Sequence, residues 1–248
     1  MAPRPLDHLA LLRTELDGFI DAVAGGPADA PVAGCPGWTL ADLGAHLGDV
    51  HRWVLGTLAS GPQPPVGSGD AHEPPEGGLD VLAAWLRDGA DRLLAELGAL
   101  DPAAAAWHPF PVEPKVAGIW PRRQLHEAVV HRWDAQHAAG LPAVIDPVVA
   151  ADGVDEYWTV MLPRMLIRTQ RRTPGSTLAV ELTDAADRTV VDGSTGLPAV
   201  LPSGTPAPAT VRGTAAQVLL RLWGRPSEGV TVEGDADVAA AWLGLGGN

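Results

Sequence analysis

The sequence predicts an α+β protein of two domains, a four-helix bundle over residues 1–145 and a small α+β domain over residues 146–248. Two observations carry this prediction. Apolar residues recur at helical spacing in four segments of the N-terminal part, whereas short stretches of alternating apolar and polar residues follow residue 145. The chain of 248 residues is long enough to bury a core in each of two small domains.

The first domain is expected to contain four helices, over residues 6–24, 40–59, 79–98 and 121–140. Thr39 is a suitable N-cap for the second helix, and Asp42 three residues later gives a start similar to a capping box. Pro121 suits the first turn of the fourth helix, and Gly140 suits its end. The Pro- and Gly-rich residues 60–77 predict a long loop, and residues 101–119 predict a second irregular connection. Four helices with two long connections suggest a bundle.

The second domain is expected to begin with a helix over residues 148–170. Its candidate strands cover residues 176–183, 188–192, 207–212 and 229–233, and two further helices are expected over residues 214–223 and 235–243. The Pro- and Gly-rich segment 193–209 predicts a loop. This mixture favours a small α+β domain.

The charge of the chain argues against two classes of partner. Its net charge is -13 and its pI is about 4.9. Nucleic-acid binding requires a basic surface that displaces phosphate counterions, and none is visible in the sequence. An anionic membrane surface is disfavoured for the same reason. The acidity itself identifies no substrate.

We expect a cytoplasmic protein. The single cysteine, Cys35, excludes an intrachain disulfide and a zinc site made of four cysteines of one chain, which fits a reducing compartment. Charged residues interrupt the apolar residues of the N-terminal segment, so it does not read as a signal peptide. No stretch approaches the ~20 apolar residues of a membrane helix. The sequence does not predict an oligomeric state.

Glu127 and His131 are four residues apart on the predicted fourth helix, which places both on one face, within reach of a shared metal ion. The neighbouring His126 does not make this segment an HExxH motif, because His126 and His131 are five apart. An alternative is an ordinary surface pair. Arg123 and Asp134 share the face of Glu127, and by periodicity alone this face is expected to be solvated.

His46 lies on the apolar face of the second predicted helix, together with Leu43, Val50 and Trp53, whereas His51 lies on the more polar side. A histidine in that position is often a core residue with a satisfied hydrogen bond. It could also meet Glu127 and His131 from a different helix, which is how metal sites in bundles are built.

Cys35 precedes a helix N-terminus, a position that can lower the pKa of a thiol. No histidine motif lies near it in the sequence, so a structural loop is favoured over a catalytic thiol. A GxSxG nucleophile motif, a P-loop and a GxGxxG dinucleotide motif are all absent from the sequence.

Two segments, CPGWTLADLGAHLGDVHRW (35–53) and RRQLHEAVVHRWDAQ (122–136), resemble the mycothiol-dependent maleylpyruvate isomerase family. A third, ATVRGTAAQVLLRLWGRPSEGVTVEGD (209–235), resembles its second domain. The resemblance covers nearly the whole chain. It implies a DinB-like four-helix bundle followed by a sterol-carrier-like α+β domain.

The resemblance also implies a set of site residues. The family's zinc ligands are a histidine on the second helix and a glutamate and a histidine on the fourth, which match His46, Glu127 and His131. The family places an arginine of the second domain near the site. Arg225 in LLRLWGRP is the closer match, with Arg221 as the alternative.

The function that the resemblance implies is a zinc-dependent enzyme that uses a low-molecular-weight thiol, mycothiol, on a small electrophilic substrate. In the family's isomerisation the thiolate adds to a conjugated double bond, the adduct rotates about the new single bond, and elimination gives the trans product. Transfer of the thiol to an electrophile is the other reaction expected. Two alternatives remain open: a non-catalytic small-molecule binding or regulatory protein, and a metal-dependent enzyme that needs no thiol.

Overall fold

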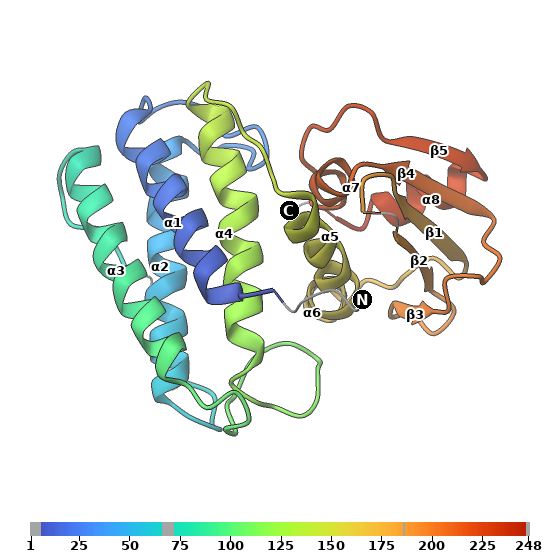
Figure 1. Cartoon of the computed structure of the whole chain (residues 1–248), viewed down its shortest axis with the longest axis horizontal. Helices are drawn as coiled ribbons and strands as arrows, with labels where there is room; N and C mark the ends of the chain where they lie inside the picture. The colour runs from blue at the N-terminus through green and yellow to red at the C-terminus, as the bar shows by residue number, and fades with distance from the viewer. Residues whose placement is uncertain (1–5, 66–71, 186, 247–248) are drawn as a thin grey trace. The chain divides into compact units, whose positions relative to one another are not determined.

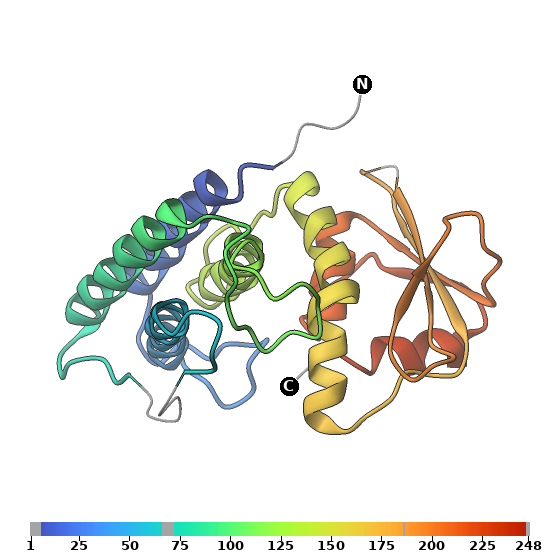
Figure 2. The same ribbon diagram turned by 90° about the horizontal axis from the view of Figure 1, so that it is seen from below.

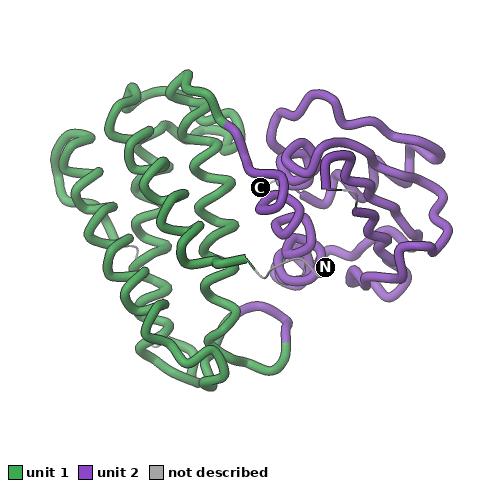
Figure 3. The backbone as a smooth tube through the Cα atoms, in the orientation of Figure 1, with its two compact units in different colours: residues 1–108, 113–143 green, residues 109–112, 144–248 purple. Residues whose placement is uncertain are grey.

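The structure, a computed structural model, describes residues 6–65, 72–185 and 187–246. The chain forms two compact units, one of residues 1–108 and 113–143, the other of residues 109–112 and 144–248 (Figure 3). Residues 66–71 of the predicted loop 60–77, and residues 1–5 of the N-terminal segment, lie outside the described residues. No described helix combines the length and hydropathy needed to cross a membrane.

The first unit is a helical bundle, as predicted. Its helices are α1 (His8–Gly25), α2 (Leu40–Ala59), α3 (Leu79–Ala99) and α4 (Ile119–Ala138) (Figure 1). α1 packs against α3 and α4, and α2 packs against the same two helices. The view in Figure 2 runs nearly along α2 and α4. The buried side chains between the helices include those of Leu12, Leu16, Phe19, Leu43, Leu86, Leu93, Trp120 and Leu125.

The ends of α2 and α4 follow the predicted signals. The Thr39 hydroxyl accepts a hydrogen bond from the Asp42 N–H at 3.2 Å, and the Asp42 carboxylate accepts one from the Thr39 N–H at 2.9 Å. This capping box satisfies backbone donors that a helix start leaves without a partner. Beyond α4, Gly140 has a φ of +69°, a left-handed conformation that glycine adopts without a Cβ clash.

Helices α2 and α3 approach each other closely at Gly48. A Cβ at this position would lie 1.8 Å from the ring of Trp85 on α3. The guanidinium of Arg52 stacks 3.7 Å above the same ring and donates hydrogen bonds of 3.0 Å to the carbonyls of Gly48 and Trp85. The absence of a side chain at position 48 therefore sets the spacing of these two helices.

The second unit is an α+β domain, again as predicted. Its described strands form a five-stranded mixed sheet in the order β3-β2-β1-β4-β5. β1 pairs in parallel with β4, and the other pairs are antiparallel. The strands are β1 (Thr177–Leu182), β2 (Asp187–Asp192), β3 (Ala199–Leu201), β4 (Ala209–Gly213) and β5 (Thr231–Gly234).

The helices of this unit differ in one detail from those expected. The predicted helix 148–170 consists of α5 (Pro147–Glu156), a π-helical segment η1 (Tyr157–Met161) and α6 (Leu162–Thr169). α7 (Ala215–Leu222) and α8 (Ala236–Leu243) match the remaining predictions. The prediction of a continuous loop over residues 193–209 is wrong, because β3 lies within it. β3 is a three-residue edge strand, too short to show an alternating pattern.

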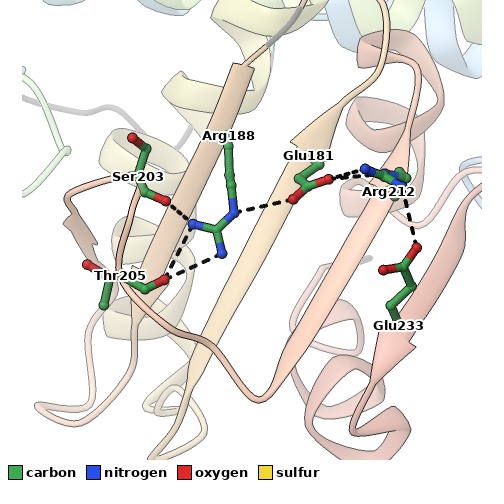
Figure 4. A network of polar contacts seen from close by, with 6 residues as sticks. All are labelled: Glu181, Arg188, Ser203, Thr205, Arg212 and Glu233. Atoms are coloured by element: carbon green, nitrogen blue, oxygen red, sulfur yellow. Dashed lines mark hydrogen bonds and ion pairs between the residues drawn. The ribbon is translucent and has the colours of Figure 1, made fainter.

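Polar side chains fix the register of the sheet on one face. The carboxylate of Glu181 in β1 lies 3.3 Å from the guanidinium of Arg188 in β2 and 2.6 Å from that of Arg212 in β4 (Figure 4). Both arginines are direct cross-strand partners of Glu181, and Arg212 also reaches Glu233 in β5 at 3.5 Å. Because exposed ion pairs contribute little stability, their main effect is to disfavour a slipped register.

The close approach at Gly48 generates a prediction. Gly48→Ala should lower the free energy of unfolding by about 1–3 kcal/mol, because the added methyl group forces α2 away from Trp85. Gly56→Ala is the matched control on the same helix, since nothing lies within 4 Å of its Cβ position. It should stabilise the protein by up to ~1 kcal/mol through helix propensity. Urea unfolding monitored by circular dichroism measures both, and a Gly48→Ala protein as stable as wild type would contradict the packing described.

Candidate metal centre

Three side chains from two helices of the first unit converge on one point. α2 supplies His46, and α4 supplies Glu127 and His131 one helical turn apart. The Glu127 Oε1 atom lies 3.6 Å from His46 Nε2 and 3.4 Å from His131 Nε2. One potential ligand atom of each residue lies within 4.8 Å of the other two. The structure thus brings together the three residues that the sequence singled out.

Aromatic rings hold the two imidazoles in place. Trp38, in the loop before α2, packs against His46 with ring centroids 4.9 Å apart. The rings of His46 and His131 meet edge-on, with centroids 5.2 Å apart. The side chains of His46, Glu127 and His131 are 32%, 20% and 10% exposed, so the cluster is most open on the side of His46.

A second layer of charged groups supports the cluster from α4. Asp134 Oδ2 lies 3.1 Å from Nδ1 of His131. The guanidinium of Arg123 donates a hydrogen bond of 2.8 Å to Glu127 Oε2, the carboxylate oxygen that does not face the histidines. Both supporting groups are buried. They fix the orientations of His131 and Glu127.

The expectation that the Glu127 face of α4 is solvated is wrong. Arg123 and Asp134 are both buried, and so is Arg132, which pairs with Glu15 of α1. Polar residues cover this helix because they pair with one another inside the bundle. Helical periodicity alone places polar residues on the exposed face, so it does not reveal buried polar residues that form hydrogen bonds with one another.

His51 corrects a second expectation. It is buried and faces α3 near Gly89, although its position beside Arg52 suggested the polar side of α2. Burial, and next the charge of Arg52, lower its pKa to about 3, so His51 is neutral at physiological pH. Neither potential ligand group found in the described residues includes His51 or His126.

Cys35 lies closer to the site than its sequence context indicated. It is buried, and its sulfur forms a second potential ligand group with His131 and Asp134, again within 4.8 Å. The turn that carries it is closed by a hydrogen bond of 3.0 Å from the Cys35 N–H to the Val32 carbonyl. No sequence motif linked Cys35 to the fourth helix, because only the folded loop brings them together.

The charge states of Glu127 and His131 are coupled. Burial raises the pKa of Glu127, but hydrogen bonds to His131 and His46 and the charge of Arg123 outweigh it and hold that pKa well below its usual range. Burial also lowers the pKa of His131, but Asp134 and Glu127 outweigh it and raise that pKa to about 9. In the metal-free protein at neutral pH, Glu127 is therefore ionised and His131 is protonated.

The donor set fits a divalent metal ion. Two imidazole nitrogens and one carboxylate oxygen are common zinc ligands, and three protein ligands leave a position for another molecule. The Asp134 carboxylate favours the tautomer of His131 that carries its proton on Nδ1. The lone pair of Nε2 can then bind a metal ion. Carboxylates commonly orient metal-binding histidines in this way. Binding would require loss of the additional proton from His131.

Arg225 lies in the second unit, just after α7. It is buried, and its Nη1 donates a hydrogen bond of 2.8 Å to the Trp223 carbonyl. The alternative, Arg221, lies in the last turn of α7 and is half-buried. The role of either arginine stays a prediction.

The fold and the cluster define a class of protein: a four-helix bundle with a His–Glu–His candidate metal centre, followed by an α+β domain. Residues 9–136 match the family model for the mycothiol maleylpyruvate isomerase N-terminal domain. Residues 148–241 match the model for the C-terminal domain of the same family. The chain therefore belongs to the mycothiol maleylpyruvate isomerase family.

Solved structures agree with this fold. A crystal structure of the mycothiol-dependent maleylpyruvate isomerase matches with a TM-score of 0.62 and 17% sequence identity, covering 93% of each chain. A histidine-to-alanine mutant of the mycothiol-dependent maleylpyruvate isomerase matches with a TM-score of 0.60 and the same identity and coverage. At this identity the likeness shows the fold alone. No curated protein matches the sequence significantly.

The pKa of His131 gives a second prediction. In metal-free protein, the His131 ring should titrate near pH 9, and Asp134→Asn should lower its pKa because the supporting hydrogen bond and charge are lost. Because the pKa of His131 is raised in the folded state, its protonation stabilises the fold, and this contribution is complete at a pH below the unfolded pKa of about 6.5. This contribution is lost as pH rises through 9.

Two-dimensional NMR of the histidine side chains measures this titration. Asp91→Asn is the matched control, because Asp91 is an exposed carboxylate of α3 that pairs with Arg13. It should leave the His131 titration unchanged. A His131 ring that titrates near the ordinary histidine value in wild type would show that the Asp134 and Glu127 contacts do not hold in solution.

Proposed function

We propose that this protein is a zinc-dependent enzyme that uses mycothiol, either to isomerise a small electrophilic substrate from cis to trans or to transfer the thiol to it. The observation that carries the proposal is the convergence of His46, Glu127 and His131 on one point, with carboxylate and guanidinium support behind them. Family membership supports the choice of mycothiol as the thiol and of a small electrophile as the substrate.

The side chains of this chain have distinct tasks in the proposed site. His46, Glu127 and His131 would hold the zinc ion. Asp134 holds the Nδ1 proton of His131, and Arg123 holds the far oxygen of Glu127. When bound, zinc would stabilise the thiolate form of the low-molecular-weight thiol near neutral pH.

The charges around the cluster support an anionic partner. Among the described groups, the carboxylates of Glu127 and Asp134 and the guanidinium of Arg123 sum to a single negative charge once His131 has lost its additional proton. A bound dication would therefore keep a net positive charge. This balance favours a thiolate over a neutral thiol.

Arg225 is proposed to hold a carboxylate of the substrate through paired hydrogen bonds. Its match to the family motif and the anchoring of its guanidinium at Trp223 support this role. Arg221 is the alternative, and substitution of each arginine in the same assay distinguishes them.

The test combines purified zinc-loaded protein, mycothiol and maleylpyruvate. We expect NMR to show formation of the trans product when the thiol is present. Titration of the total thiol then separates the two reactions, because isomerisation returns the thiol and transfer consumes it. Glu127→Ala should lower turnover at least about 100-fold. Glu96→Ala, an exposed glutamate of α3, should leave turnover unchanged. Turnover without thiol would support a thiol-independent metal enzyme. The absence of a reaction with every electrophile tried would contradict the proposal.

A further inference from the structure

A pocket of about 410 Å³ opens on the second unit, between the C-terminal end of α6 and the turn that follows β2. One part of its lining is aliphatic and comes from Leu166, Ile167 and Leu197. The other part includes the side chains of Arg171 and Arg172. A pocket of this size that combines an apolar wall with a few polar groups is the usual form of a small-molecule site.

The backbone around the pocket is held in one conformation. The Thr173 N–H donates to the Gly196 carbonyl at 3.1 Å, and the Thr173 hydroxyl donates to the Gly193 carbonyl at 2.8 Å. Gly196 has a φ of +91°, and a Cβ there would lie 3.2 Å from the Arg172 guanidinium. Arg172 thus lies directly against the backbone of this turn.

Arg171 is anchored as well. Its Nη2 donates a hydrogen bond of 3.0 Å to the carbonyl of Gly244, at the end of α8. That contact uses one of its five N–H donors and leaves the others for a ligand. Arg171 is therefore positioned by the fold before a ligand arrives, and Arg172 lies against the turn at Gly196.

These two guanidinium groups lack the carboxylate partners that Arg188 and Arg212 have. Arg188 and Arg212 pair with carboxylates on the sheet. Among the described residues, no carboxylate lies within 4.0 Å of the guanidinium of Arg171 or Arg172. The two positive charges lie in a protein whose net charge is -13. They provide local attraction for an anion.

The apolar wall is only partly covered. Ile167 is 55% exposed and Leu197 is 38% exposed, although both are large aliphatic residues. An apolar group placed against them would remove hydrocarbon surface from water. Charge and hydrophobic surface thus meet in one pocket.

We propose that this pocket binds an organic carboxylate whose charged group lies at Arg171 and Arg172 and whose apolar body of about eight carbon atoms covers Ile167 and Leu197. The pocket lies within the second unit and shares no residue with the candidate metal centre. The inference goes beyond the proposed function and does not depend on it.

The first experiment is isothermal titration calorimetry of the full chain, free of added metal, with octanoate as the probe. Octanoate should bind saturably at one site per chain. 1-Octanol, which lacks the charge, and acetate, which lacks the apolar body, should each bind at least about tenfold more weakly. No saturable octanoate binding, or equal binding of octanol, would overturn the proposal.

Variants locate the binding. Arg172→Ala removes an exposed guanidinium that makes no hydrogen bond within the described structure, so the fold should stay intact by circular dichroism. It should weaken octanoate at least about tenfold, and Ile167→Asp should do the same. Arg168→Ala is the matched control, since Arg168 is an exposed arginine of α6, next to Ile167, that does not line the pocket. Its affinity should stay within about twofold of wild type. Unchanged affinity in Arg172→Ala would place octanoate elsewhere and contradict the assignment.

Discussion

The arrangement of the bundle depends on the ionised carboxylate of Glu127. A charge removed from water on the inner side of a helix must be paired, or it costs several kcal/mol. The structure pairs one oxygen with Arg123 and directs the other to His46 and His131. This requirement explains why the polar face of α4 points inward and why Asp134 stands behind His131. A cluster assembled so closely around one oxygen atom is well suited to exchange a proton for a metal ion.

Much of the first unit could be predicted from the sequence because local signals determine it. The capping box at Thr39 and the left-handed Gly140 are properties of a few neighbouring residues. The placement of His51 and the burial of Arg123 and Asp134 depend instead on which helices become neighbours, which no single-helix pattern contains. For the same reason, the three metal-ligand candidates came from the family resemblance together with the spacing of Glu127 and His131.

In the second unit, too, features set by local sequence could be predicted, and features that depend on contacts between distant segments could not. Strands with clear alternation were predicted within about two residues of their ends, as is usual for boundary assignments, whereas β3 lacked the length to be recognised. The π-helical segment η1 lies in what reads as one continuous helix, because its apolar spacing is compatible with either form. The pocket beside α6 could not be predicted, since it joins residues about 25 positions apart through a turn whose conformation rests on Gly196.

The most direct test of this metal centre is the metal content of the purified, metal-replete protein, measured by elemental mass spectrometry. A metal centre at His46, Glu127 and His131 predicts one zinc ion per chain in wild type. It also predicts loss of the ion in His46→Ala, Glu127→Ala and His131→Ala, with circular dichroism showing that each variant is folded. His137→Ala, which removes a histidine of the same helix outside the cluster, should keep the metal. Wild-type protein without stoichiometric metal, or metal retained in all three variants, would contradict the assignment of this cluster as a metal centre.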